Sequence, residues 1–133
     1  MTWLDLPPGW VTGAARRPLV GTARPERWDG PFVPNLVVAV EPVDEPWPDY
    51  AERSTAALVD VLALPILIDA RVDEGQLQIV VGHELFGRRL TLVQRHVGAA
   101  GRAAVASFTV ADVDWPGLCR QILASVATLK APS

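Results

Sequence analysis

The chain is poor in the residues and runs on which several classes of protein depend. Its only cysteine is Cys119, so no internal disulfide can form and no cysteine-based metal site exists. It has one lysine against eleven arginines and a formal net charge of −3. A general nucleic-acid surface is not expected, because phosphate contacts need clustered basic residues. No run of about 18 apolar residues occurs, so we expect no membrane insertion.

The beginning of the chain carries no targeting pattern. The stretch Met1–Leu6 has no basic start and no apolar run of signal-peptide length. We therefore predict a cytoplasmic protein. The 133 residues, half of them apolar, are enough for one domain with a substantial core. The domain is predicted to span residues 1–133.

Motifs that carry catalysis or bind cofactors are also missing. There is no Gly-x-Ser-x-Gly elbow, Walker loop or Gly-x-Gly-x-x-Gly. Asp69 and Asp73 lie four residues apart on one predicted strand, about 13 Å from each other, too far for a retaining glycosidase pair. Cys119 lies at the border of an apolar helix stripe, where a packed thiol is expected. We predict no catalytic residue, no cofactor and no enzymatic activity.

The two histidines are the candidates for a metal pair. His83 and His96 flank one predicted hairpin, but pairing its strands places His96 opposite Leu77, at the far end from His83. Six residues of strand separate them, about 20 Å. One metal ion cannot bridge that distance, so the histidines are interpreted as turn and strand-end residues and no metal site is predicted.

What the chain does contain is a clear pattern of strands and two helices. Nine of twelve prolines and four of five tryptophans lie in the first 48 residues, which predicts short extended pieces and ordered loops there. Asp49 and Glu52 have the form of a capping box, and Pro116 suits a first helical turn. The predicted strands are 10–12, 19–23, 35–41, 66–72, 77–81, 89–97 and 103–110, with helices at about 50–62 and 115–130.

The strand 35–41 is apolar throughout, which predicts cover on both faces. The strand 66–72 alternates Ile66, Ile68, Ala70 and Val72 with mostly charged residues, which predicts one wet face.

The register of the last hairpin decides which side chains share a face. A three-residue loop ending in a left-handed Gly101 would place Gly98 opposite Arg102 and Leu92 opposite Phe108. A two-residue loop pairing Leu92 with Ser107 was the alternative, and a one-residue slip exchanges the faces. The preferred register predicts a core face of Leu77, Ile79, Val81, Leu90, Leu92, Ala104, Ala106, Phe108 and Val110. The second face would then carry Thr91, Val93, Arg95, Val105, Ser107 and Thr109.

That second face carries small residues of mixed polarity, so the sequence leaves open what covers it. The N-terminal half could lie over it, a partner could dock there, or a homodimer could bury it. The tryptophans, which are nearly 4 % of the chain, are interpreted either as loop anchors on the core edge or as exposed binding platforms. The candidate partner or ligand surface consists of Trp10, Trp28, Trp47, Arg88, Arg89, Val93, Arg95 and Val105.

The order of elements, together with a few short stretches, resembles a known superfamily. The stretches are Leu6–Trp10 at the start, Phe32–Val38, Gly87–Thr91 and Ile122–Val126. The chain is similar to the PsbP-like superfamily, in particular its small LpqN-like actinobacterial members. The resemblance implies an α+β fold, with a central mostly antiparallel sheet of about six strands packed by two main helices in an α/β/α sandwich.

The same resemblance implies binding rather than catalysis. Relatives serve as assembly or import factors, lipoproteins, or chaperones that shield apolar segments of secretion effectors. The chain departs from the lipoprotein members in having no lipobox cysteine. We therefore expect a protein-binding adaptor or chaperone for a secreted or membrane-directed partner such as a secretion effector. The alternative is a small-molecule or lipid-binding protein with a Trp-lined pocket.

Overall fold

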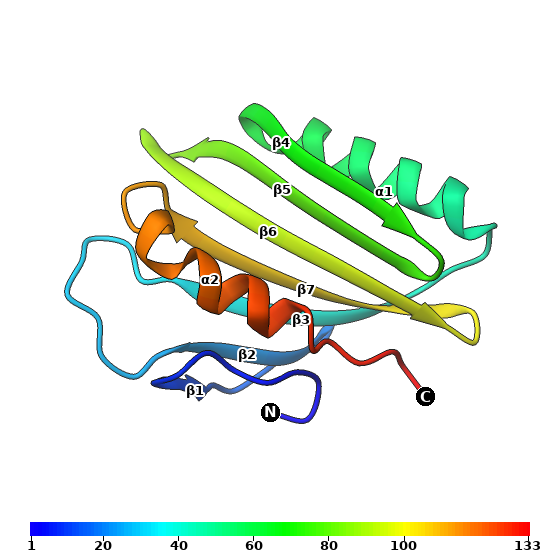
Figure 1. The fold of residues 1–133 in the computed structure, drawn as a ribbon, viewed down its shortest axis with the longest axis horizontal. Helices are drawn as coiled ribbons and strands as arrows, with labels where there is room; N and C mark the ends of the chain where they lie inside the picture. Colours follow the sequence, from blue (N-terminus) through cyan, green and yellow to red (C-terminus); the bar gives the residue numbers. More distant parts are fainter.

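The protein is built on one antiparallel sheet. The computed structural model describes all residues, from Met1 to Ser133. Seven strands lie in the spatial order β1-β2-β3-β7-β6-β5-β4, and every neighbouring pair is antiparallel (Figure 1). The strands are β1 (Trp10–Thr12), β2 (Leu19–Pro25), β3 (Asn35–Pro42), β4 (Ala63–Asp73), β5 (Gln76–Leu85), β6 (Arg88–Ala99) and β7 (Arg102–Ala111). The α+β class is confirmed, with seven strands where the resemblance implies about six.

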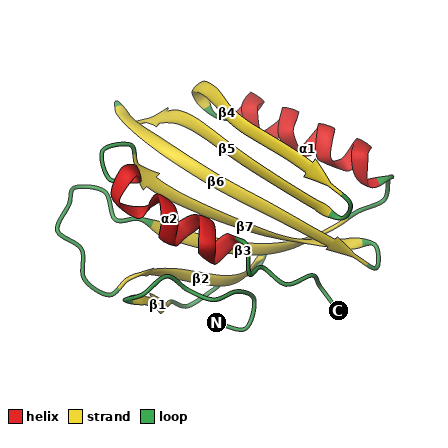
Figure 2. Cartoon of the chain, viewed as in Figure 1, coloured by secondary structure: helices red, strands yellow, loops and turns green.

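The two helices, α1 (Trp47–Val61) and α2 (Trp115–Val126), lie on opposite faces of the sheet (Figure 2). Alternation along the strands explains this arrangement, because successive side chains point to opposite faces. Helix α2 buries Ile122 and Val126 in a large core with Val93 and Phe108. Helix α1 covers a smaller cluster made by Ala51, Leu77, Ile79, Val81 and Leu92. We call these two sides of the sheet the α2 face and the α1 face.

Both helices have a proline in the first turn and no side-chain hydrogen bond that caps the start. Helix α1 starts after Pro46, three residues earlier than the predicted capping box allows, and Asp49 lies in its first turn. The capping box is therefore wrong. An acidic residue in the first turn still favours the helix through its dipole. Helix α2 starts after Asp114, as predicted, with Pro116 in its first turn, but it ends at Val126 rather than Lys130.

The predicted register between β6 and β7 is wrong. Gly98 lies opposite Ala103, and Val93 rather than Leu92 lies opposite Phe108. The cause is a two-residue turn in which both Ala100 and Gly101 have positive φ, 54° and 77°. Two positive φ values are typical of a type I′ hairpin turn, and an alanine in that conformation is not signalled by its residue type. The one-residue slip separates Leu90 and Leu92, on the α1 face, from Phe108 and Val110, on the α2 face.

Strand β3 is covered on one face only. Leu36 and Val38 are fully buried under the α2-face core, whereas Val37 and Ala39 line a groove on the α1 face. The prediction that both faces would be covered is wrong. The N-terminal half does not lie over the second face either, because β1, β2 and β3 extend the sheet sideways.

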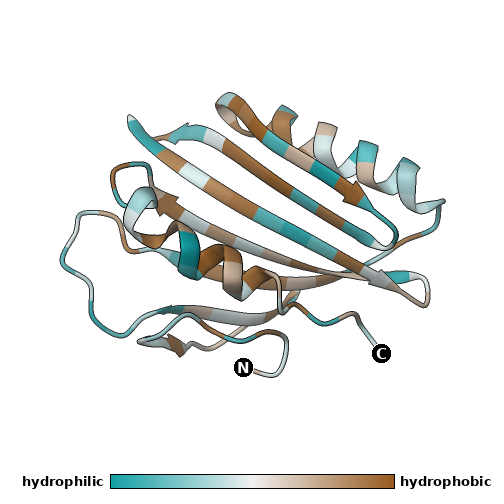
Figure 3. Cartoon of the chain, in the orientation of Figure 1, coloured by the Kyte–Doolittle hydropathy of each residue, from teal (hydrophilic) through white to brown (hydrophobic).

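Strand β4 forms an edge of the sheet and is exposed along almost its whole length. A β-bulge between Leu67 and Asp69 breaks the predicted alternation. Ile66, Ile68 and Val72, predicted to lie on the covered face, are each more than half exposed. Figure 3 shows this mixture of apolar and polar residues on the outer strand. No helix is both long and apolar enough to span a membrane.

Candidate functional site

The α1 face carries an open groove because α1 covers only part of it. Helix α1 contacts β4 and β5, so the α1 face of β3, β7 and half of β6 has no helix over it (Figure 1). The groove has a volume of about 380 Å³. Its floor comes from the sheet and its wall from α1. The lining residues are Val37, Ala39, Glu41, Arg53, Ser54, Ala57, Leu58, Val61, Gln94, His96, Val105 and Ser107.

The floor of the groove is made of short side chains. Ala39 lies opposite Val105, and Val37 opposite Ser107, across the β3–β7 pair. All four are partly exposed. Small side chains keep the floor low beside the helix. The apolar surface left open can therefore accept part of another molecule.

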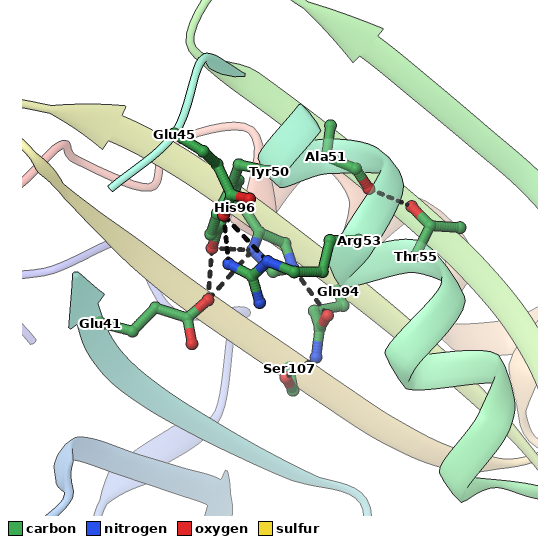
Figure 4. A network of polar contacts seen from close by, with 9 residues as sticks. All are labelled: Glu41, Glu45, Tyr50, Ala51, Arg53, Thr55, Gln94, His96 and Ser107. Carbon is green, nitrogen blue, oxygen red and sulfur yellow. Dashed lines mark hydrogen bonds and ion pairs between the residues drawn. The ribbon is translucent and has the colours of Figure 1, made fainter. Parts of the chain in front are cut away.

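A chain of polar contacts runs along the groove from Glu41 to Ser107 (Figure 4). The Tyr50 hydroxyl donates to Glu41 Oε1 and lies 2.7 Å from His96 Nδ1. His96 Nε2 lies 2.7 Å from the side-chain amide of Gln94, which contacts Ser107 Oγ at 3.0 Å. These residues come from α1, β3, β6 and β7, so the chain of contacts joins the helix to three strands.

Burial sets the charge states in this chain. His96 is 3 % exposed, and burial lowers its pKa to about 4, so the imidazole is neutral at pH 7. Gln94 Oε1 faces Nε2, so the neutral ring carries its proton on Nε2 and donates it to Gln94. Burial, followed by the hydrogen bond to Glu41, raises the pKa of Tyr50 well above its usual value. The phenol therefore stays a neutral donor to Glu41.

The rim of the groove beside this chain is charged. Arg53 Nε donates to Glu45 Oε1 at 2.9 Å, and its guanidinium lies 5.5 Å from the centre of the Tyr50 ring. Glu45 raises the pKa of Arg53 further by accepting this hydrogen bond. The groove thus offers an apolar floor with an acidic group and a basic group at one end.

The predicted surface residues do not gather at this groove. Val105 alone lines it. Val93 is 1 % exposed in the core under α2, and Arg95 lies on the same α2 face, donating to Gln78 Oε1 and Gln76 Oε1 at 2.8 Å each. The predicted second face that joined Val93, Arg95 and Val105 is therefore wrong, as a consequence of the register.

The tryptophans occupy three separate places. Trp10 is 9 % exposed and packs edge-on against Phe108, so it is a core anchor rather than a platform. Trp47 lies against Gly98, and its Nε1 donates to Gln76 O at 3.1 Å. Trp28 shares with Trp10 a shallow depression of about 270 Å³ on the other side of the molecule. No single pocket is lined by all three.

The structure also gives the positions of the two predicted arginines and of the two histidines. Arg88 is exposed on the β5–β6 turn, and Arg89 Nη1 donates to Leu64 O at 3.1 Å, holding the start of β4. His83 lies opposite Leu90 and His96 opposite Leu77, which confirms the predicted pairing and the separation of the two rings. No group of three or more His, Cys, Asp or Glu side chains is arranged to hold a metal ion.

Sequence reasoning missed most of the groove. Tyr50, Glu41 and His96 lie far apart in the chain and form no motif. The available signals were weak. They were a lone tyrosine at the start of a helix and a histidine near the end of a predicted strand. Only a correct register would have placed His96 and Val105, directly opposite each other across β6 and β7, on one face.

Comparison with known proteins identifies the fold. No family model matches the chain, and no curated protein matches its sequence. Solved structures match along nearly its whole length, and they define a PsbP-like fold.

LpqN of Mycobacterium tuberculosis, a protein involved in cell envelope biogenesis, matches with a TM-score of 0.72 at 14 % identity, over 94 % of this chain and 79 % of LpqN. PA94 of Pseudomonas aeruginosa, a protein of unknown function, matches with a TM-score of 0.64 at 16 % identity, over 93 % of this chain and 99 % of PA94. The cyanobacterial PsbP of Synechocystis matches at 0.59 and 14 % identity, over 93 % and 82 %. The predicted PsbP-like fold with LpqN-like neighbours is confirmed.

Proposed function

We propose that the protein is a non-enzymatic protein-binding module that holds an apolar segment of a partner in the groove between α1 and the strands β3, β7 and β6. The observation that carries this proposal is the uncovered floor around Ala39 and Val105. Apolar surface left open in a small domain marks interaction sites. The low floor and the helix wall give a trough, which suits an extended or helical segment.

The shape of the groove favours a protein segment over a small molecule. Its volume, about 380 Å³, lies at the low end of small-molecule sites, and such sites bury most of the ligand's surface. This groove is open along its length. An occupant lying on the sheet floor keeps its outer side in solvent. A partner protein can leave that side uncovered, whereas a small ligand needs most of its surface buried.

The charged end of the groove gives the proposed partner a direction. Glu41 and the Arg53–Glu45 pair lie beside the buried Tyr50–His96 contact. A partner segment with an apolar stretch followed by a basic residue would place that residue near Glu41. Segments of this kind occur in secreted and membrane-directed proteins, which supports the adaptor or chaperone role.

The first test is to identify the partner at the groove. A photo-crosslinking amino acid at Ala57, on the helix wall, is predicted to capture one partner protein in stoichiometric yield from cells of the native organism. The matched control carries the same group at Val113, which is 82 % exposed and outside the groove. Equal capture at both positions, or none at Ala57, would count against the proposal.

Substitution in the floor then tests the groove with the captured segment as a synthetic peptide. Ala39→Arg fills the trough with a long side chain and a charge, so the affinity for this peptide should fall at least ~10-fold. Val113→Arg makes the same charge change outside the groove and should bind like the parent protein. Isothermal titration measures both, and unchanged affinity of Ala39→Arg would refute groove binding.

A further inference from the structure

The outer edge of β4 differs from the other edge of the sheet. The opposite edge is β1, which has three residues, whereas β4 has eleven. Short edge strands protect a sheet from pairing with another chain, and a long edge exposes a row of unpaired backbone donors and acceptors. Five apolar side chains of β4 are also largely exposed: Leu64, Ile66, Leu67, Ile68 and Val72.

One half of this edge is protected and the other half is not. Pro65 lacks a backbone donor, and the bulge between Leu67 and Asp69 distorts the ladder. Beyond the bulge, residues 69–73 pair regularly with β5, from Asp69 opposite Val80 to Asp73 opposite Gln76. Any added strand is therefore expected to pair with this second half.

The charges of the second half are self-complementary. Asp69 and Arg71 lie on the same side of the strand, and Arg71 Nε lies 2.8 Å from Asp69 Oδ2. In a symmetric antiparallel pair of identical strands, the two-fold axis must pass between two copies of one residue, because opposed side chains share a face. An axis at Ala70 places each Asp69 opposite the Arg71 of the second copy.

Other positions of the axis fit less well. An axis at Asp69 or at Arg71 sets like charges against each other, which is destabilising. An axis at Val72 pairs Arg71 with Asp73, but it sets Asp69 against Gly75 of the second copy, which lies in the turn after β4. The axis at Ala70 is the one that sets opposite charges against each other and keeps the opposed residues within β4.

The surroundings of the edge support a second copy as the occupant. Helix α1 lies beside β4 and leaves an apolar cleft of about 640 Å³ between them, with Ala56, Val59, Leu67 and Val72 in its walls. A two-fold axis perpendicular to the sheet at Ala70 places the second copy's α1 on the same face as this cleft. Pairing at the edge is therefore expected to bury exposed apolar side chains of β4 as well as backbone groups.

We propose that the protein forms a homodimer in which two β4 strands pair antiparallel about Ala70 and join the two sheets into one. The contact lies outside the groove on the other side of α1, and does not depend on the groove's function. Pairing by strand addition is a known use of exposed sheet edges. Here the exchange of the Asp69–Arg71 ion pair between copies would select the register.

Charge exchange tests the register in the full chain. Asp69→Arg sets arginine against arginine, so the dimer dissociation constant from sedimentation equilibrium should rise at least ~10-fold. The double variant Asp69→Arg with Arg71→Asp restores opposite charges and should recover the dimer. Asp44→Arg makes the same charge change on an exposed loop and serves as the control. A monomeric parent protein at micromolar concentration, or a dimer insensitive to Asp69→Arg, would overturn the proposal.

A cysteine at the axis tests the same contact covalently. Residues directly opposite in antiparallel strands have Cα atoms roughly 4.5–5.5 Å apart, within the range of a disulfide. In a Cys119→Ser background, Ala70→Cys should form a disulfide-linked dimer on mild oxidation. Ala63→Cys, exposed on the same strand but far from the axis, should not. Equal linkage of both, or tight binding of an apolar strand peptide to a monomer that does not link, would contradict the dimer.

Discussion

At the residue scale, the most informative side chain is His96. A sequence reading treats it as a strand-end residue, and its position opposite Leu77 followed correctly from pairing the hairpin. Its contacts with Tyr50 and Gln94 could not be foreseen, because they depend on where α1 crosses the sheet. Buried histidine that is held neutral makes stability depend on pH.

The sign of that dependence follows from the lowered pKa. The unfolded chain binds a proton on His96 near pH 6.5, and the folded chain does so only near pH 4. The contribution of neutral His96 is therefore fully present above pH 6.5 and is lost as the pH falls toward 4. Between pH 7 and pH 5 the free energy of unfolding should fall by roughly 2 kcal/mol from this group alone.

His96→Gln keeps polar atoms near Tyr50 and Gln94 but does not titrate. Its free energy of unfolding should therefore change less between pH 7 and pH 5 than that of the parent protein, by the roughly 2 kcal/mol assigned to His96. Urea unfolding at both pH values measures the difference. The exposed carboxylates titrate equally in both proteins, so their contributions to the pH dependence cancel in the comparison. Parallel pH profiles would show that His96 is not held neutral by the fold.

At the element scale, the position of α1 depends on one contact at its start. Trp47 packs on Gly98 of β6, where an added Cβ would lie 2.4 Å from the indole ring. Leu58 and Leu62 continue the contact over the smaller core. Because α1 forms the wall of the groove, Trp47 helps to set the groove's width. The sequence left Trp47 open between a loop anchor and an exposed binding platform, and in the structure it packs on the sheet at the start of α1.

Gly98→Ala should displace Trp47 and destabilise the protein by about 1–3 kcal/mol, the usual cost of overpacking a close contact. Thermal unfolding and tryptophan fluorescence measure the change. The control is Gly117→Ala, in α2, where an added Cβ meets nothing within 4 Å. Equal stability of the Gly98→Ala variant and the parent protein would show that the Trp47 contact does not hold α1 in place.

The strands and helices themselves were predictable from local patterns, and their pairing was less so. Alternation and turn residues located all seven strands and both helices, because apolar periodicity reflects burial directly. The β6–β7 register failed because Ala100 adopts a left-handed conformation that favours glycine. One residue of slip was enough to mix the core with the groove, so Val93 and Val105 were assigned to one face when they belong to two.

At the scale of the whole molecule, the sheet is wider than its helices can cover. Seven strands carry one short helix on each face. The N-terminal segment and α2 cover the α2 face, and Leu4, Trp10 and Ile122 are part of the core there. On the other face α1 lies toward β4, which leaves the groove on its inner side and the apolar β4 edge on its outer side. Both open surfaces arise from the same placement of α1.

The groove as a partner-binding site is the central claim, and nuclear magnetic resonance tests it most directly. Titrating the ¹⁵N-labelled protein with the peptide of the captured partner segment should shift the backbone amides of Ala39, His96 and Val105, together with those of α1 that face the groove. The β4 edge and the depression at Trp28 should be unaffected. Shifts confined to β4 or to the Trp28 surface, with the groove amides unchanged, would contradict the account.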